Sequence, residues 1–201
     1  MNRILVWDWP VRIGHWLLAG AFVLAWLTGD SETWRLVHVW AGGAVVGVVL
    51  FRLLWGLVGT RYARFASFVR GPGAVKAYFL GLFRHTLAEQ PGHNPAGGWA
   101  IVALLSLGLL SGASGWLIYQ DIGGEWLEEL HETLASTMLA MVIVHVIGVL
   151  TGSLAHGENL VRAMFTGMKR GDADAAIAGA RPLAVPLLLT CAATCAWWLA
   201  R

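Results

Sequence analysis

Charged residues are scarce in this chain. Asp, Glu, Lys and Arg together make up 13% of its 201 residues, about half of the roughly 25% that is usual in soluble domains. Hydrophobic residues make up 57%, and several apolar runs reach the length of about 20 residues that a helix needs to cross a bilayer. These proportions argue against a soluble domain and favour a protein that crosses the membrane several times.

Cysteine is equally rare. The two cysteines, Cys191 and Cys195, lie four residues apart in the last apolar run, and no histidine follows them. They therefore lack the C-x-x-C-H pattern of covalent haem attachment, and we expect them to pack as small apolar side chains. The net charge of +2 gives no reason to expect a nucleic-acid partner.

The N-terminus also lacks the pattern of a cleavable signal peptide. Asp8, Pro10 and Arg12 interrupt the region before the first apolar run, and no small-residue cleavage site follows that run. We therefore expect the first apolar helix to be retained.

Apolar runs bounded by turn or charge signals predict five membrane-spanning helices. They cover about residues 11–29, 35–58, 97–119, 125–154 and 183–200. An amphipathic piece near 73–87, in the long connection after the second span, is expected on the membrane surface. The predicted fold is an all-α integral membrane bundle. Its four-helix core lies in a domain over residues 1–175, and a fifth transmembrane helix lies in 176–201.

Basic residues fall on one side of this five-helix arrangement. That side carries Arg3, Arg12, Arg61, Arg64, Arg70, Lys76, Arg84, Arg162, Lys169, Arg170 and Arg181. The opposite side carries Asp30, Glu32, Arg35, Asp121, Glu125, Glu128, Glu129 and Arg201. Because Lys and Arg are retained on the cytoplasmic side, we expect the N-terminus inside and the C-terminus outside.

Four of the seven histidines lie within predicted spans, where an ionisable side chain is costly and marks a functional candidate. They are His15, His38, His131 and His145. His131 and His145 are fourteen residues apart, so they lie on nearly the same helix face and about 21 Å apart along its axis. The other three, His85, His93 and His156, fall in loops or at an interfacial helix end, where a solvated histidine needs no special role.

The four histidines match in depth as two pairs. His15 lies near the start of the first span, level with His145, and His38 lies near the start of the second span, level with His131. Imidazole is a good iron ligand, and facing helices of a bundle commonly build cofactor sites. We therefore predict two stacked haems, each held by two histidines. The alternative is that each histidine forms hydrogen bonds between helices.

Three arginines accompany these histidines. Arg12 and Arg35 each precede a histidine by three residues and so share its helix face. Arg52 follows His38 by fourteen residues on the same face. Their guanidinium groups are predicted to bind haem propionates, although Arg52 can also extend to the membrane surface. Small residues can admit either a flat macrocycle or a close helix contact: Gly42, Gly43, Gly47, Gly108, Gly112 and Gly115.

Several short stretches together resemble the bacterial cytochrome b561 group, which includes the b-type cytochrome subunits of nickel-iron hydrogenases and formate dehydrogenases. They are RIGHW at 12–16, the run 35–38, FRLLWG at 51–56, RYARF at 61–65, 130–132 with His145, and 156–167. The resemblance covers about residues 5–170. It implies two haem b groups on the same four histidines, with the same pairing. It also implies electron exchange between a partner on the outer face and the quinone pool. The tail beyond Ala173 lies outside the match.

The leading hypothesis is a multi-pass cytochrome of the bacterial inner membrane that relays electrons between a periplasmic redox partner and quinone. The partner is expected to be a cytochrome c or another redox subunit. Acidic residues at the start of the fourth span suit a basic cytochrome c, and equally suit a helix N-terminus. His156 and Asn159 are candidates for hydrogen bonds to a quinone carbonyl, with a structural cap or a lipid contact as the alternative.

Two other functions fit the same residues. One is a stand-alone membrane oxidoreductase that acts on a small species such as superoxide together with quinone. The other is a non-redox transporter or assembly protein that uses the histidines for metal or proton movement. The haem absorption spectrum separates the last function from the first two.

Overall fold

The computed structural model describes residues 2–84, 86 and 91–201, and most of them are helical. The helices are α1 (Trp9–Thr28), α2 (Arg35–Val58), α3 (Phe65–Phe68), α4 (Pro72–Arg84), α5 (Pro95–Tyr119), α6 (Glu125–His156), α7 (Leu160–Thr166) and α8 (Val185–Leu199). Two short strands, β1 (Asn2–Leu5) and β2 (Met168–Gly171), pair in an antiparallel sheet. Short 3-10 turns are η1 (Glu32–Trp34), η2 (Ala173–Ala175) and η3 (Pro182–Ala184).

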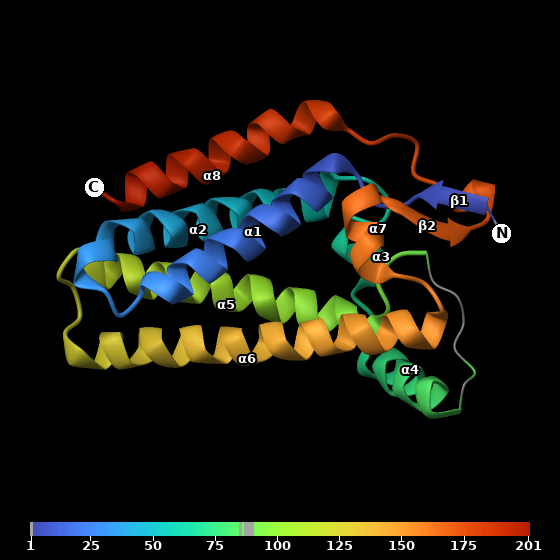
Figure 1. The fold of residues 1–201 in the computed structure, drawn as a ribbon, viewed down its shortest axis with the longest axis horizontal. Helices are drawn as coiled ribbons and strands as arrows, with labels where there is room; N and C mark the ends of the chain where they lie inside the picture. The colour runs from blue at the N-terminus through green and yellow to red at the C-terminus, as the bar shows by residue number, and fades with distance from the viewer. Residues whose placement is uncertain (1, 85, 87–90) are drawn as a thin grey trace.

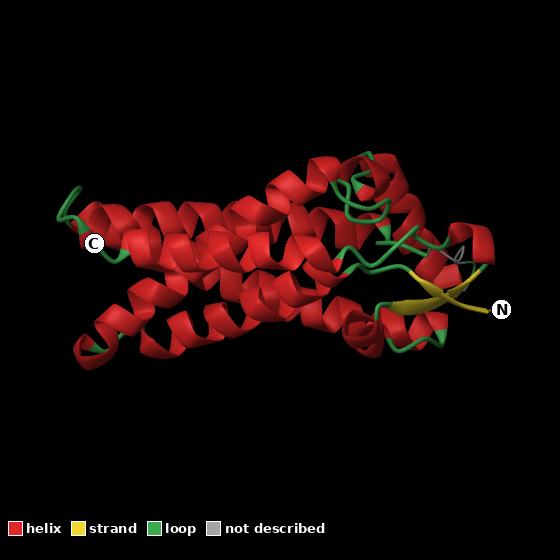
Figure 2. Cartoon of the chain, turned by 90° about the horizontal axis from the view of Figure 1, so that it is seen from above, coloured by secondary structure: helices red, strands yellow, loops and turns green. Residues whose placement is uncertain are grey.

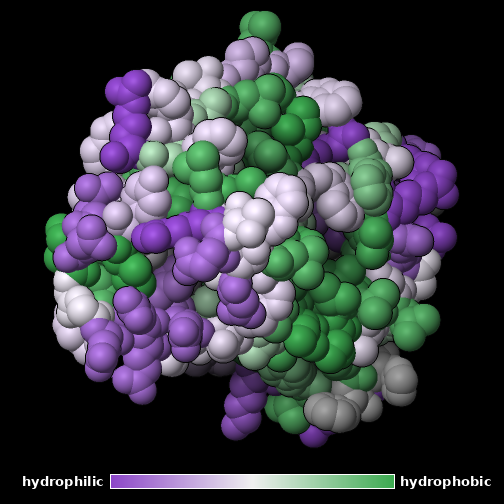
Figure 3. Space-filling model, turned by 60° about the vertical axis from the view of Figure 1, so that its left-hand side comes forward, coloured by the Kyte–Doolittle hydropathy of each residue, from purple (hydrophilic) through white to green (hydrophobic). Residues whose placement is uncertain are grey.

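Among the residues that the structure describes, five helices are long and apolar enough to cross a membrane, which confirms the predicted all-α membrane bundle. They are Trp9–Thr28, Glu32–Val58, Pro95–Tyr119, Glu125–His156 and Pro182–Leu199. Large apolar side chains remain on the outside of the bundle, for example Leu154 at 84% and Leu183 at 93% exposure, and broad hydrophobic areas cover the surface in Figure 3. A lipid environment accommodates such surfaces at no cost in free energy, because lipid tails are as apolar as these side chains.

The spans run lengthwise and alternate in direction (Figures 1 and 2). The strands, α4, α7 and the N-terminus gather at one end of the bundle, which we call the sheet end. The C-terminus and the turn between α5 and α6 lie at the opposite end, which we call the far end. α1 therefore starts at the sheet end, and α2 returns to it.

The fifth span packs closely along α2. A Cβ atom added at Gly43 would lie 2.6 Å from Cα of Ala196, and one added at Gly47 would lie 2.7 Å from Cα of Ala192. Both glycines therefore let the α8 backbone approach α2. Of the two roles that the sequence allows for these two glycines, the structure shows the close helix contact.

The fourth span, α6, packs along α5 and meets α2 at the rings of His38 and His131. A small apolar core fills the region between α1, α2 and α5, where Ala21, Val45, Val49 and Leu105 are buried. The four candidate histidines are carried by α1, α2 and α6.

Asp8 joins the start of α1 to the end of α2. Its side chain is fully buried. The N–H of Val11 donates to Oδ1 at 2.8 Å, while Nε1 of Trp55 and Oγ1 of Thr60 donate to Oδ2 at 2.9 and 2.7 Å. The carboxylate thus caps α1 and fixes the two helix ends relative to each other.

The sequence predicts a helix in the connection between the second and third spans, but it does not predict the small sheet. A helix does occupy 72–84, within the expected amphipathic piece, of which residues 85 and 87 lie outside the described residues. The small sheet is not predicted from the sequence, because each strand has only four residues and its partner is more than 160 residues away. Such short strands carry too little periodicity to be detected.

Candidate functional site

His38 of α2 and His131 of α6 face each other at the far end. Their ring centroids are 6.1 Å apart and their planes are inclined at 78°. Nδ1 of His38 lies 2.8 Å from the carbonyl oxygen of Ala25, and Nδ1 of His131 lies 3.0 Å from that of Ser111. Because a carbonyl only accepts, each Nδ1 must carry the proton, which leaves the lone pair of Nε2 available to a metal.

This spacing fits one iron between the two rings. Metal–imidazole bonds are roughly 2 Å long. With the distance from each nitrogen to its ring centre added, two imidazoles that bind one metal ion would have ring centroids roughly 6 Å apart. The observed separation of 6.1 Å agrees with that arrangement. A hydrogen bond that Nδ1 donates to a carbonyl oxygen is also a usual way to orient a metal-bound histidine.

Residues of α5 form the pocket that holds the His131 ring. A Cβ atom added at Gly115 would lie 2.9 Å from Cε1 of His131, so only glycine leaves the ring in place. Oγ of Ser114 lies 3.0 Å from Nδ1 of the same ring. Gly115 therefore makes room for an imidazole, a role that the sequence did not assign to it.

Space also remains next to His38. A Cβ atom added at Gly42, four residues after His38 and on the same helix face, would meet no atom within 4 Å. Two imidazoles with protonated Nδ1 atoms and an open position at Gly42 therefore fit a haem group at the far end.

His15 of α1 and His145 of α6 are the second candidate pair, and both lie towards the sheet end of their helices. Nδ1 of His15 is buried and has no hydrogen-bond partner among the described residues. The rings of His15 and Trp16 meet edge-on, with their centroids 4.9 Å apart. The fourteen-residue spacing on α6 separates this pair from the far-end pair by about 21 Å along the helix.

The predicted arginine partners differ in their surroundings. Arg12 donates from Nη2 to the carbonyl oxygen of Phe165 and lies over the ring of Trp9, 4.3 Å from its centroid. Arg12 therefore connects α1 to α7. Arg35, which is exposed, lies 5.7 Å from the centroid of Tyr119 at the far end.

Arg52 is enclosed by aromatic rings near the sheet end of α2. Its guanidinium carbon lies 5.1 Å from the ring centroid of Phe65 and 5.8 Å from that of Phe68. Its Nη1 is buried without a hydrogen-bond partner among the residues that the structure describes. An unpaired buried donor is costly, so Arg52 is suited to hold an anionic group.

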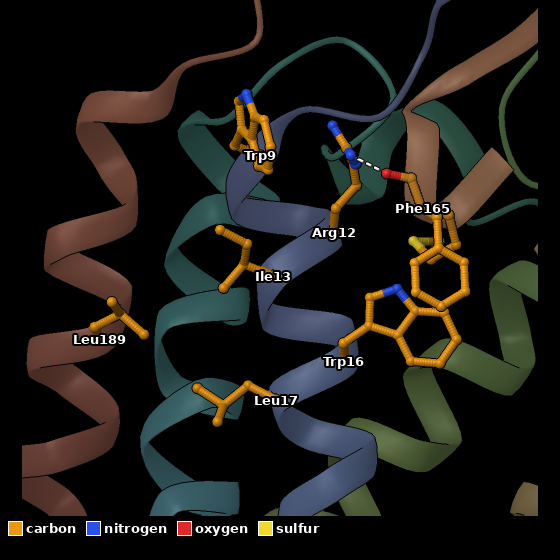
Figure 4. Close-up of a pocket in the computed structure, with 8 residues that line it drawn as sticks. Trp9, Arg12, Ile13, Trp16, Leu17, Phe165 and Leu189 are labelled. Atoms are coloured by element: carbon orange, nitrogen blue, oxygen red, sulfur yellow. Dashed lines mark hydrogen bonds between the residues drawn. The ribbon is translucent and has the colours of Figure 1, made fainter. Parts of the chain in front are cut away.

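A groove opens between α1, α7 and α8 (Figure 4). Its volume is about 360 Å³. Trp16 and Phe165 stack within it, with ring centroids 4.2 Å apart. Its lining also includes Trp9, Ile13, Leu17 and Leu189. The groove is therefore apolar and aromatic, and Trp16 connects it to His15.

The two candidate quinone residues lie at the end of α6 and the start of α7. His156 is the last residue of α6. Oδ1 of Asn159 accepts a hydrogen bond of 2.7 Å from the N–H of Arg162 and so caps α7. The structure thus shows the capping role of Asn159 that the sequence offered as an alternative.

His93 is the functional candidate that the sequence did not single out. It lies between two aromatic rings, 4.5 Å from Trp7 and 4.9 Å from Phe68. Burial lowers the pKa of His93 far below its usual value, and the positive charges of Arg52 and Lys169 lower that pKa further. The sequence did offer one signal for the position of His93. The Asn94-Pro95 pair marks a helix start, so the preceding His93 lies at the sheet end.

Comparison with known proteins identifies the family. The family model described as prokaryotic cytochrome b561 matches residues 6–167, so the chain belongs to this family, and the resemblance noted in the sequence is confirmed. Membership of this b-type cytochrome family implies haem b as the cofactor.

Two curated relatives are named as hydrogenase cytochrome subunits. The chain is 27% identical over 143 residues to "Probable Ni/Fe-hydrogenase 1 B-type cytochrome subunit" of Escherichia coli K12, covering 58% of this chain and 60% of the relative. It is 24% identical over 215 aligned positions to "Probable Ni/Fe-hydrogenase B-type cytochrome subunit" of Rhodobacter capsulatus, covering 83% of this chain and 81% of the relative. The chain thus spans about three fifths of the length of the E. coli relative. No solved structure matches it.

Proposed function

We propose that the chain binds two haem b groups, one at His38 and His131 and one at His15 and His145, and transfers electrons across the membrane. The observation that carries this proposal is the far-end pair, 6.1 Å between ring centroids with both Nδ1 atoms bonded to carbonyls. When bound, each haem supplies reversible one-electron transfer at its iron.

The protein residues orient the ligands and set their basicity. The carbonyls of Ala25 and Ser111 hold the far-end imidazoles in the tautomer that leaves the Nε2 lone pair free to bind a metal. Such outer contacts also increase the basicity of the imidazole. Gly115 keeps the His131 ring at its depth, because any larger side chain would displace it.

The sheet end faces the cytoplasm in this proposal, and the far end faces the periplasm. The support is the set of eleven basic residues predicted for the N-terminal side, because such residues remain on the cytoplasmic side. A redox protein at the far end, such as a periplasmic cytochrome c or another redox subunit, is then the electron-exchange partner. The names of the curated relatives favour a subunit of a redox enzyme over a stand-alone enzyme.

Quinone exchanges electrons at the sheet end in this proposal. The groove of Figure 4 has two flat aromatic side chains, Trp16 and Phe165, and Trp16 contacts the candidate ligand His15. A site at His156 and Asn159 is the competing location. Slower haem reoxidation by a soluble quinone in Trp16→Ala, but not in Asn159→Ser, would assign the groove, and the opposite result would assign the second location.

Haem quantitation on the purified protein tests the central proposal. We expect two haems per chain, and we expect one to be lost in each of four variants. His38→Ala and His131→Ala should lose the same haem, and His15→Ala and His145→Ala should lose the other. A protein that retains both haems in all four variants would show that the ligands lie elsewhere.

A further inference from the structure

Positively charged and histidine side chains from several elements converge at the sheet end. His93 precedes α5, and the charged groups that act on it come from α2, β2, α6 and α1. They are Arg52, Lys169, His145 and His15. Arg52, Lys169 and His93 therefore lie close to the sheet-end histidines.

The two carboxylates close to this cluster are already engaged. Asp8 acts on Arg52, but its oxygens accept hydrogen bonds from Val11, Trp55 and Thr60. Glu158 accepts a hydrogen bond of 2.6 Å from the N–H of Arg170, and its other oxygen lies 3.9 Å from Nζ of Lys169. Arg52 still has a buried Nη1 without a partner in the described part of the chain.

Arg52 and His93 share the ring of Phe68, which brings the two donors to one place. The guanidinium carbon lies 5.8 Å from that ring centroid and the imidazole centroid 4.9 Å from it. Aromatic walls exclude water, so a buried donor there gains most from a charged acceptor. The two side chains therefore provide donors suited to a carboxylate, and Arg in particular binds carboxylates strongly.

We propose that His93 and Arg52 bind a propionate of the sheet-end haem. The inference rests on the proposed function, since it takes His15 and His145 as the axial ligands of that haem. Neutral His93 donates one ring N–H to the propionate, and Arg52 donates from Nη1. Neither role requires a proton to be transferred.

Two substitutions at His93 separate hydrogen bonding from packing. His93→Phe keeps a flat ring between Trp7 and Phe68 but has no donor, whereas His93→Gln keeps a donor and loses the ring. The measurement is a potentiometric titration of the purified protein, with haem content and the propionate bands of the resonance Raman spectrum recorded on the same samples.

We expect His93→Phe to lower the midpoint potential of one haem and to shift its propionate bands, because the propionate charge is less well neutralised. His93→Gln should remain close to the wild type, and the other haem should not change in either variant. Arg52→Gln should lower the same potential as His93→Phe, whereas Arg61→Gln, at an arginine beside Tyr62, should have no effect.

The opposite pattern would overturn the proposal. If His93→Phe behaves as the wild type while His93→Gln loses the haem, or if both lose it equally, then His93 only packs between its aromatic neighbours. Unchanged potentials and unchanged propionate bands in all variants would also overturn it. A failure of the proposed function is distinguishable, because the wild-type protein would then lack the second haem.

Discussion

The far-end and sheet-end histidine pairs are held by different interactions. At the far end, both imidazoles have an Nδ1 bonded to a backbone carbonyl. At the sheet end, Nδ1 of His15 has no such partner among the described residues, but Arg52, Lys169 and His93 lie close by. At the far end, the backbone therefore contacts the candidate ligands directly. At the sheet end, charged and histidine side chains lie beside the candidate ligands instead.

If each pair binds a haem as proposed, this difference has a consequence for the two haem potentials. A hydrogen bond from Nδ1 to a carbonyl makes imidazole a stronger base, which stabilises the ferric iron and lowers the potential. Nearby positive charges disfavour the ferric form and raise the potential. The first effect lowers the far-end potential, and the second raises the sheet-end potential. Both widen the difference between the two potentials, and together they favour electron flow from the far end towards the sheet end.

The largest expected effect is the loss of one site. Gly115→Val places side-chain atoms where the His131 ring lies, since a Cβ atom alone would be 2.9 Å from Cε1. We expect the variant to retain one haem per chain, bound at the sheet end. Gly20→Val is the matched control, because a Cβ atom there meets nothing within 4 Å. Two haems in both variants would contradict the assigned position of the far-end site.

A disturbance at α8 should affect the two sites equally. Gly47→Val forces α8 away from α2, because a Cβ atom would lie 2.7 Å from the Ala192 backbone, and overpacking of this kind costs roughly 1–3 kcal/mol. We expect a lower melting temperature in detergent with the haem ratio unchanged. Selective loss of one haem would show that α8 supports that site in particular.

The order of the two potentials follows from the surroundings. In the wild type, the haem that is lost in His15→Ala should have the higher midpoint potential, and the haem that is lost in His131→Ala the lower one. Redox titration of these two single-haem variants measures the order directly. A reversed order would show that burial or haem geometry outweighs the ligand contacts and the nearby charges.

The smallest effect is expected at Ser114. Its Oγ lies 3.0 Å from Nδ1 of His131, but the carbonyl of Ser111 remains as an acceptor at the same distance. Ser114→Ala should therefore keep both haems and change only the far-end potential, by the equivalent of about 1 kcal/mol or less. A shift at the sheet-end haem instead would argue that the two sites are coupled through α5.

The sequence predicts the features that depend on one helix at a time. Five apolar runs become the five spans, and the regular rise of a helix places His131 and His145 at two depths on one face. That regularity also puts His38 level with His131, and the structure does bring these two rings together. Depth and face follow from covalent geometry, so they can be read before any packing is known.

Lateral contacts between helices and loops could not be predicted in this way. The burial of His93 requires Trp7 from the N-terminal segment and Phe68 from α3 to meet beside it, and the contact of Arg12 with Phe165 requires α7 to fold back onto α1. The composition and spacing of the chain determined how many helices cross the membrane and at which depth the histidines lie. Only the tertiary structure decided which side chains surround them, because those contacts arise from the packing of segments that are distant in the chain.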